Sequence, residues 1–353
     1  MLKIGILLGD DIGPEVVRAI LQQLRLFSGG CMPYTRLGAT LCSMVVMFAG
    51  SGMASGQNYP NKPIRIVTAQ TGGAADLVVR QIAQGLTGSL SQQVIVDNRG
   101  GAAGAIAAQT VAKTPADGYT LLAYSSNLWL LPFLRNDVPF ELTDFSPITM
   151  AASSPNVLVV HPSLPAKSVK ELIVFAKGRP GQLSYSSGGS GSTLHLSAEL
   201  FKSMAGIDVV HVPYKSGGVG LIDLLGGRVQ VMFPVAAAAM PHGKTGRLRI
   251  LAVTSPEPSP LVPGVPTVAA SGLPGYASEL TVGVFAPVGT SAPIVDRLNR
   301  EIVRLLSQPD SKEKFFDLGL KPVGSSPEQL MVTVKAEMVK WGKVIKDAGI
   351  HAD

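Results

Sequence analysis

The chain has 353 residues, of which 46% are hydrophobic and 15% charged, and its formal net charge is +6. This length exceeds one ordinary hydrophobic core and predicts two lobes, and the apolar content excludes a disordered protein. The basic residues are scattered, without a Lys/Arg run or interleaved aromatic residues, so we expect no nucleic-acid partner. Cys31 and Cys42 both precede the predicted mature start, which excludes cysteine nucleophiles and thiolate metal sites from the mature chain.

Residues 2–17 differ in character from the rest of the chain. They predict a short apolar strand, a turn of glycine and aspartate, and a helix opened by Pro14. This stretch resembles the start of the isopropylmalate/tartrate dehydrogenases, which implies an NAD-dependent β-decarboxylating enzyme. Because the resemblance stops soon afterwards, we predict that residues 1–31 are a start-site extension or a gene-fusion remnant.

Residues 32–56 carry a second signal. A short basic region ending at Arg36 precedes the apolar stretch 37–50 and a run of small residues, which is the pattern of a secretory signal peptide. The apolar stretch is shorter than the ~20 residues that a transmembrane helix needs, so export is favoured over a membrane anchor. We predict a leader that is cleaved after Gly56 or after Ala54.

From Pro63 onward, strand patterns alternate with helix patterns. Strands are expected at residues 64–67, 94–96, 119–124, 156–160, 183–185, 209–214, 229–233, 248–253 and 282–287. Helices are expected after the strands at 64–67, 94–96, 156–160, 183–185 and 209–214, and three more close the chain. This alternation predicts parallel sheets with right-handed crossovers. We therefore predict an α/β fold of two lobes with mainly parallel sheets and a two-strand hinge, in which residues 58–158 plus 283–353 form lobe 1 and residues 159–282 form lobe 2.

The strand-to-helix loops at residues 71–76, 186–192 and 216–218 consist mostly of glycine, alanine and serine. The first amides of a helix have no intrahelical partner and lie at the positive end of its dipole, and small residues let an anion approach them. Each loop alone is typical of an ordinary tight turn. Because several of them follow strands, where such sheets bind ligands, together they indicate an anion-binding cleft.

Enzyme signatures are missing from the sequence. There is no G-x-S-x-G, G-x-G-x-x-G or H-E-x-x-H motif, and the five histidines lack metal-ligand spacing. Asp76 is expected to be a cap or dipole partner, with the alternative of holding a ligand ammonium group or a loop. His195 is expected to be a structural hydrogen-bonding residue, with the alternative of contacting a ligand carboxylate. We predict no catalytic residues, no metal and no cofactor.

A longer resemblance runs from Tyr59 nearly to the C-terminus. The segments that carry it are, in order, Tyr59-Pro60-Asn61-Lys62-Pro63, Asp97-Asn98-Arg99, Asp117-Gly118-Tyr119-Thr120, His195-Leu196 and Val210-His211-Val212-Pro213-Tyr214. They resemble the substrate-binding receptors of tripartite tricarboxylate transporters, also called Bug-type receptors. The resemblance implies a periplasmic protein with the type II periplasmic binding-protein fold, which captures a carboxylate between a loop of each lobe, largely through backbone N–H groups.

Carried over to this chain, the resemblance implies a set of ligand-binding residues. In lobe 1 they are Thr71, Gly72, Gly73, Ala74, Ala75, Asp76 and Ser126. In lobe 2 they are Ser187, Gly188, Ser190, Gly191, Ser192, His195, Ser216 and Gly217. Thr71 stands where the family usually has proline, and Pro234 stands where many members have an acidic residue, which predicts a ligand without an amino group.

We therefore predict a monomeric periplasmic receptor that delivers a small carboxylate to membrane transporter subunits. One alternative is a receptor that signals to the sensor kinase of a two-component system. The other is the NAD-dependent dehydrogenase suggested by residues 2–17. That enzyme needs metal-binding aspartates, substrate-binding arginines and a cofactor loop, and the sequence lacks this combination downstream.

Overall fold

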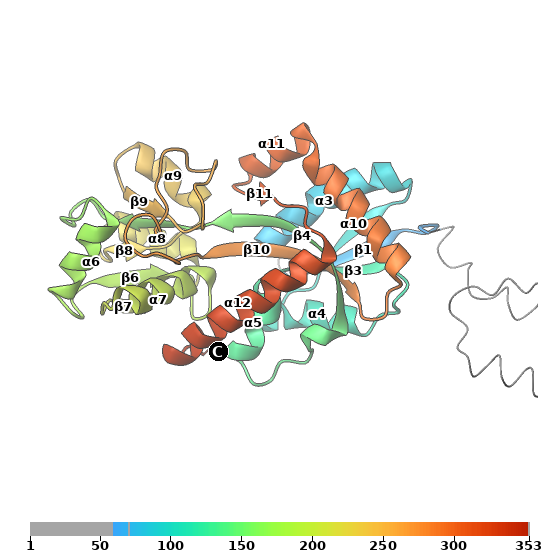
Figure 1. Cartoon of the computed structure of the whole chain (residues 1–353), viewed down its shortest axis with the longest axis horizontal. Helices are drawn as coiled ribbons and strands as arrows, with labels where there is room; N and C mark the ends of the chain where they lie inside the picture. The colour runs from blue at the N-terminus through green and yellow to red at the C-terminus, as the bar shows by residue number, and fades with distance from the viewer. Residues whose placement is uncertain (1–58, 70, 352–353) are drawn as a thin grey trace, which may run out of the picture. The chain divides into compact units, whose positions relative to one another are not determined.

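Two mixed β-sheets carry the fold of the residues that the structure describes (Figure 1). The computed structural model describes residues 59–69 and 71–351. The predicted extension at 1–31, with its dehydrogenase-like start, and the predicted signal peptide at 32–56 lie outside the described residues. No helix in the described ranges is long and apolar enough to cross a membrane.

Within the described residues, the first sheet has six strands in the order β11-β4-β10-β3-β1-β2, and we call it the lobe 1 sheet. Its strands are β1 (Ile64–Thr68), β2 (Val94–Asn98), β3 (Thr120–Ser125), β4 (Phe145–Pro155), β10 (Glu279–Pro287) and β11 (Lys321–Pro322). β2 and β3 pair with β1 in parallel, whereas β10 runs antiparallel to its neighbours β3 and β4. β1 is apolar at Ile64, Ile66 and Val67, which are all buried because helices cover both faces of the sheet.

Helices pack on both faces of the lobe 1 sheet. They are α3 (Ala74–Leu90), α4 (Ala105–Ala112), α5 (Asn127–Leu134), α10 (Ala292–Ser307), α11 (Pro309–Asp317) and α12 (Pro327–Asp347). α3 buries Val78, Ile82 and Leu86 at helical spacing, and these side chains share a hydrophobic cluster with Leu298 and Ile302 of α10. The buried side chains of α4, α5 and α12 belong to a second cluster on the opposite face.

The second sheet in the described residues, the lobe 2 sheet, has five strands in the order β7-β6-β8-β5-β9. Its strands are β5 (Val157–Val160), β6 (Ser184–Ser187), β7 (Val210–Pro213), β8 (Val231–Met232) and β9 (Arg249–Val253). Its helices are α6 (Val169–Lys177), α7 (Thr193–Ala205), α8 (Gly217–Leu225) and α9 (Ala236–Lys244). The serines at 168, 192 and 216 cap α6, α7 and α8 by accepting a first-turn amide, which explains where these helices begin.

The two-lobed α/β fold is confirmed, but each sheet is mixed rather than mainly parallel. β4 leads out of the lobe 1 sheet and β10 leads back into it, so they run in opposite directions, from Glu279 opposite Pro155 to Pro287 opposite Phe145. β5 likewise runs antiparallel to β8 and β9. Strands that arrive from the other sheet are not joined to their neighbours by helical crossovers, so the predicted parallel pattern does not extend to them.

The chain passes from the lobe 1 sheet to the lobe 2 sheet at Asn156 and returns in the segment before Glu279. Thr254, just after β9, links the two passages, since Thr254 N donates to Asn156 O (2.9 Å) and Ser278 N donates to Thr254 O (2.9 Å). The buried Asn156 side chain also donates through Nδ2 to Ser197 Oγ of α7 (3.1 Å). The two connections therefore lie side by side, as a hinge between lobes requires.

Candidate ligand-binding site

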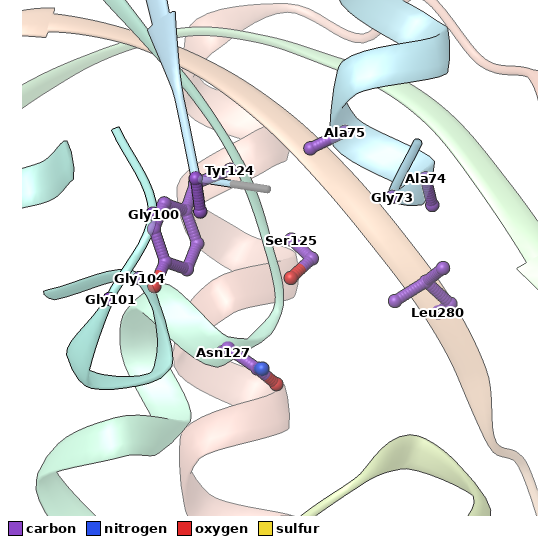
Figure 2. A pocket seen from close by; sticks show the side chains of 11 residues that line it. Gly73, Ala74, Ala75, Gly100, Gly101, Gly104, Tyr124, Ser125, Asn127 and Leu280 are labelled. Atoms are coloured by element: carbon purple, nitrogen blue, oxygen red, sulfur yellow. The ribbon is translucent and has the colours of Figure 1, made fainter. Parts of the chain in front are cut away.

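A cavity of about 550 Å³ opens where the parallel strands of the lobe 1 sheet end (Figure 2). Figure 2 shows the start of α3 on one side, the Gly100–Gly104 loop with Tyr124 on the other, and Ser125 and Asn127 between them. The full lining is Ala69, Gly73, Ala74, Ala75, Gly100, Gly101, Gly104, Tyr124, Ser125, Asn127 and Leu280. None of these described lining residues carries a charged side chain, so a charged ligand there depends on main-chain dipoles.

α3 begins at the cavity with main-chain amides that no side chain of the described residues caps. Its N-cap is Gly73, which has extended φ and ψ angles and makes no side-chain cap bond. Gly73, Ala74 and Ala75 all line the cavity, and their side chains are no larger than a methyl group. The amides of this first turn have no partner within the helix. The start of α3 is therefore able to bind an anion.

Asp76 holds the loop that leads into α3. It is 2% exposed, and its carboxylate accepts hydrogen bonds from Gly72 N (2.8 Å), Arg80 Nε (3.0 Å) and Asn98 Nδ2 (2.9 Å). Burial alone would raise the pKa of Asp76, but the hydrogen bonds from Arg80, Gly72 and Asn98 outweigh it and lower that pKa. Asp76 is absent from the cavity lining, and its carboxylate holds the loop, which is part of the alternative predicted for it, while it also lies in the first turn of α3 as a dipole partner would.

The other predicted lobe 1 residues do not line the cavity. Thr71 and Gly72 are exposed in the loop before α3. Ser126 is 1% exposed at the start of α5, where its amide donates to Thr281 O (3.0 Å). Its hydroxyl has no hydrogen-bond partner among the described residues, and neither does the buried hydroxyl of Thr68. Thr68 and Ser126 each directly precede a lining residue, and unpaired buried hydroxyls of this kind are rare.

The Gly100–Gly104 loop forms the side of the cavity opposite α3. Gly101 and Gly104 have φ angles of 109° and 92°, which favour glycine. A Cβ atom on Gly104 would overlap the Tyr124 hydroxyl and lie 2.9 Å from the Cβ atom of Ala69. Tyr124 is buried, and burial raises the pKa of its hydroxyl, so the ring stays neutral at physiological pH. Glycine at 104 is therefore what lets the loop approach β1 and β3.

The predicted lobe 2 residues form a separate cluster that does not contribute to this cavity lining. The Ser187–Ser192 loop and the start of α8 are adjacent, because a Cβ atom on Gly188 would lie 3.1 Å from Gly217 N. Ser192 Oγ accepts from His195 N (3.3 Å) and Ser216 Oγ accepts from Val219 N (3.5 Å). At the starts of α7 and α8, one first-turn amide is thus already hydrogen-bonded to the serine that caps the helix. The start of α3 has no such side-chain cap.

Sequence reasoning missed the lining residues outside α3, which are Ala69, Gly100, Gly101, Gly104, Tyr124, Ser125, Asn127 and Leu280. Most of them lie at or just after the ends of β1, β2 and β3, and the position of small residues after a strand could have identified them. Leu280 has no local signal. It reaches the cavity because β10 pairs with β3.

Comparisons with known proteins place this chain in a family. Residues 78–350 match the family described as "Tripartite tricarboxylate transporter family receptor". The chain is 36% identical over 322 residues to protein BugT of Bordetella pertussis, an alignment that covers 90% of this chain and 99% of BugT. It is 38% identical over 298 residues to a Pseudomonas sp. protein from a tcbD-tcbE intergenic region, which covers 84% of this chain and 89% of that protein.

Solved structures of similar proteins have the same fold. An R. palustris protein solved with adipate has a TM-score of 0.71 and 38% identity, and the match covers 83% of this chain and 99% of that chain. MatC from Rhodopseudomonas palustris, solved with bound malate, has a TM-score of 0.65 and 29% identity over 81% of this chain and 100% of MatC. The periplasmic binding protein BugD has a TM-score of 0.68 and 29% identity over 84% of this chain and 100% of BugD. The chain therefore belongs to the tripartite tricarboxylate transporter receptor family, which is a family of binding receptors and not of enzymes.

Proposed function

We propose that this protein is a periplasmic receptor that binds a small carboxylate and delivers it to the membrane subunits of a tripartite transporter. The observation that carries the proposal is the uncapped start of α3 at a cavity of about 550 Å³. Similar proteins were solved with adipate and with malate, which are both dicarboxylates. A carboxylate is the ligand that such a helix start favours.

The chemistry of the cavity supports an anionic ligand without an amino group. A cation would need a carboxylate or a ring of carbonyl oxygens, and the described lining offers no acidic side chain. A carboxylate can instead accept hydrogen bonds from the amides of Gly73 to Ala75, where the helix dipole is positive. We therefore expect malate to bind more tightly than aspartate, because aspartate adds an ammonium group that would lose its water without gaining a partner.

The predicted lobe 2 residues lie where they could contact the ligand when the lobes close. The Ser187–Ser192 loop lies beside α5 of lobe 1, since a Cβ atom on Gly191 would come within 2.9 Å of a Leu134 methyl group. In the proposed mechanism, a movement about the paired connections at Asn156 and Ser278 brings this loop over the ligand. Only the closed state then contacts the ligand from both lobes, so ligand binding shifts the equilibrium toward closure.

The test of the carboxylate site is the substitution Gly73→Asp. Aspartate fits the extended backbone of an N-cap, so it would cap the first-turn amides and place a negative charge beside the cavity. We expect adipate binding, measured by calorimetry, to weaken about tenfold or more while the melting temperature is unchanged or higher. The matched control is Ser291→Asp at the start of α10, which lies outside the cavity lining and should leave binding unchanged.

Two outcomes would contradict the proposal. One is a Gly73→Asp variant that binds adipate as tightly as the unmodified protein. The other is a thermal-shift panel in which sugars or cations stabilise the protein and adipate, malate and other carboxylates do not.

Export and the transporter partner have their own tests. N-terminal sequencing of the secreted protein should show a mature start after Gly56 or Ala54, and a secreted chain that retains Lys3 or Asp10 would contradict the leader. Crosslinking of the liganded receptor to native membranes should recover the transporter subunits, and recovery of a sensor kinase instead would favour the signalling alternative.

A further inference from the structure

The rings of Tyr185, His195 and His211 stack beside the Ser187–Ser192 loop of lobe 2. The centroids of His195 and His211 are 4.0 Å apart with an interplanar angle of 13°, and those of Tyr185 and His211 are 4.8 Å apart with an angle of 15°. Tyr185 lies in β6, His195 in α7 and His211 in β7. This packing holds both imidazoles in one orientation.

Each histidine is hydrogen-bonded to the loop. Gly191 N donates to His195 Nδ1 (3.1 Å), and His211 Nε2 lies 2.7 Å from Ser187 Oγ. Ser187 Oγ also accepts from Gly189 N (3.1 Å). The loop is therefore fixed to the histidine pair at Ser187 and at Gly191, on either side of the exposed Ser190.

The bond to Gly191 fixes the protonation state of His195. An amide N–H can donate only to an unprotonated ring nitrogen, so His195 must be neutral and carry its proton on Nε2. The nearest carboxylate is Glu199, whose Oε1 lies 4.0 Å from His195 Nε2 and accepts hydrogen bonds from the Tyr185 hydroxyl and from Lys202 Nζ (2.7 Å).

The surroundings keep this histidine neutral. Burial, and next the adjacent His211, lower the pKa of His195 to about 4, although Glu199 opposes the shift. Burial also lowers the pKa of His211. Lys202 adds to both effects, because a second positive charge nearby disfavours an imidazolium.

We propose that His195 is a positioning residue, whose neutral Nδ1 holds Gly191 and thereby sets the shape in which the Ser187–Ser192 loop meets the ligand carboxylate. The inference rests on the proposed function, because it assigns a role to the lobe 2 half of that site. Protonation of Nδ1 would place two N–H groups against each other at His195 and Gly191. The loop would then lose one of its two attachments, and the amides of its tip would lose their orientation.

The first test needs no ligand and no substitution. Nitrogen-15 spectra of the imidazoles should show His195 with its proton on Nε2 at pH 7, and the Gly191 amide should be protected from hydrogen exchange. Both signals should change together as the pH falls toward about 4. A proton on Nδ1 at pH 7, or a Gly191 amide that exchanges as fast as that of Ser190, would overturn the inference.

The second test compares His195→Leu with His195→Asn. Asparagine places an amide oxygen near the position of Nδ1, whereas leucine removes the acceptor and keeps a similar volume. We expect the leucine variant to lose protection at Gly191 and to bind adipate or malate about tenfold more weakly, as the loss of a buried hydrogen bond predicts. The asparagine variant should keep most of the protection at Gly191 and most of the affinity for the carboxylate. If His195 only filled space, asparagine would have no advantage over leucine.

The outcomes separate this inference from the proposed function. If the unmodified protein binds a carboxylate and His195→Leu binds it equally tightly, the positioning role is wrong and the receptor function stands. If no carboxylate binds the unmodified protein while Gly191 protection still follows His195, the loop attachment stands and the proposed ligand is wrong.

Discussion

Gly104 lies where the backbone after β2 packs against Tyr124. Its φ angle of 92° belongs to the left-handed region, and an added Cβ atom would overlap the Tyr124 hydroxyl. Tyr124 cannot move away freely, because its ring is 2% exposed within the core. Gly104 therefore combines two reasons for glycine, a backbone conformation and a lack of space.

We expect Gly104→Ala to lower the free energy of unfolding by about 1–3 kcal/mol, because it adds backbone strain and overpacking together. The measurement is urea unfolding. The matched control is Gly88→Ala in α3, where the described residues place no heavy atom within 4 Å of the new Cβ atom. That substitution should stabilise the protein by about 0.5–1 kcal/mol, since alanine favours a helix interior. Equal effects of the two substitutions would contradict this account.

The start of α3 depends on Asp76 for its position. The carboxylate is hydrogen-bonded to Gly72 in the preceding loop, to Asn98 at the end of β2 and to Arg80 one turn further along the helix. These bonds connect the loop, the strand and the helix that border the cavity. They also lower the pKa of Asp76 in the folded protein, so the charged form favours folding.

We expect Asp76→Asn to lower the free energy of unfolding at pH 7 by about 1–3 kcal/mol, because one carboxylate makes several hydrogen bonds there. A lowered folded pKa means that the contribution of Asp76 is present above its ordinary pKa of 3.8 and is lost as the pH falls through the folded value. The difference between the two proteins should therefore shrink below about pH 3.8. Asp137→Asn, at an exposed ion pair with Arg135, should change little at either pH, and an equal loss there would contradict this account.

The two lobes share a hydrophobic cluster through α12. This helix packs against β4 and α5 of lobe 1 and against α7 of lobe 2. Trp341 of α12 is 3% exposed and belongs to a cluster that also includes Trp129 of α5 and Phe201 of α7. Because the cluster is continuous, we expect the lobes to unfold together in one cooperative transition.

The substitution Trp341→Ala tests this coupling. It should lower the free energy of unfolding by about 3–5 kcal/mol, as the loss of a large buried side chain predicts. Far-UV circular dichroism and tryptophan fluorescence should still give coincident transitions in the variant. Val339→Ala on the same helix removes a side chain that is 78% exposed and should have little effect. Two separate transitions in the unmodified protein would show that the lobes are not coupled.

The sequence predicts the strands and helices whose apolar pattern is local. It fails for β4, α5 and α9. Prolines interrupt each of them, at Pro147 and Pro155 in β4, Pro132 in α5 and Pro241 in α9. β4 exists because β10 pairs with it along its whole length, and no local pattern contains that partner.

In the candidate site too, some features follow from the local sequence and others depend on which strands pair. Gly73, Ala74 and Ala75 follow a strand and open a helix, so chain order alone predicts their position at the cavity. The attachment of His195 to Gly191 is local as well, but its stack on His211 requires β7 to lie beside β6. Features that depend on which strands become neighbours were out of reach of the sequence pattern.

The wall of the cavity beside α3 consists of glycine, alanine and main-chain atoms to an unusual degree. Among its described lining residues, Tyr124 has the side chain that can release a proton, and burial shifts that release to strongly alkaline conditions. Backbone amides neither gain nor lose protons across the range in which bacteria live. On the proposed function, the lobe 1 half of the site would therefore bind alike in acidified and in alkaline media, and the limit in acid would come from neutralisation of the nutrient and from protonation of His195 toward about pH 4.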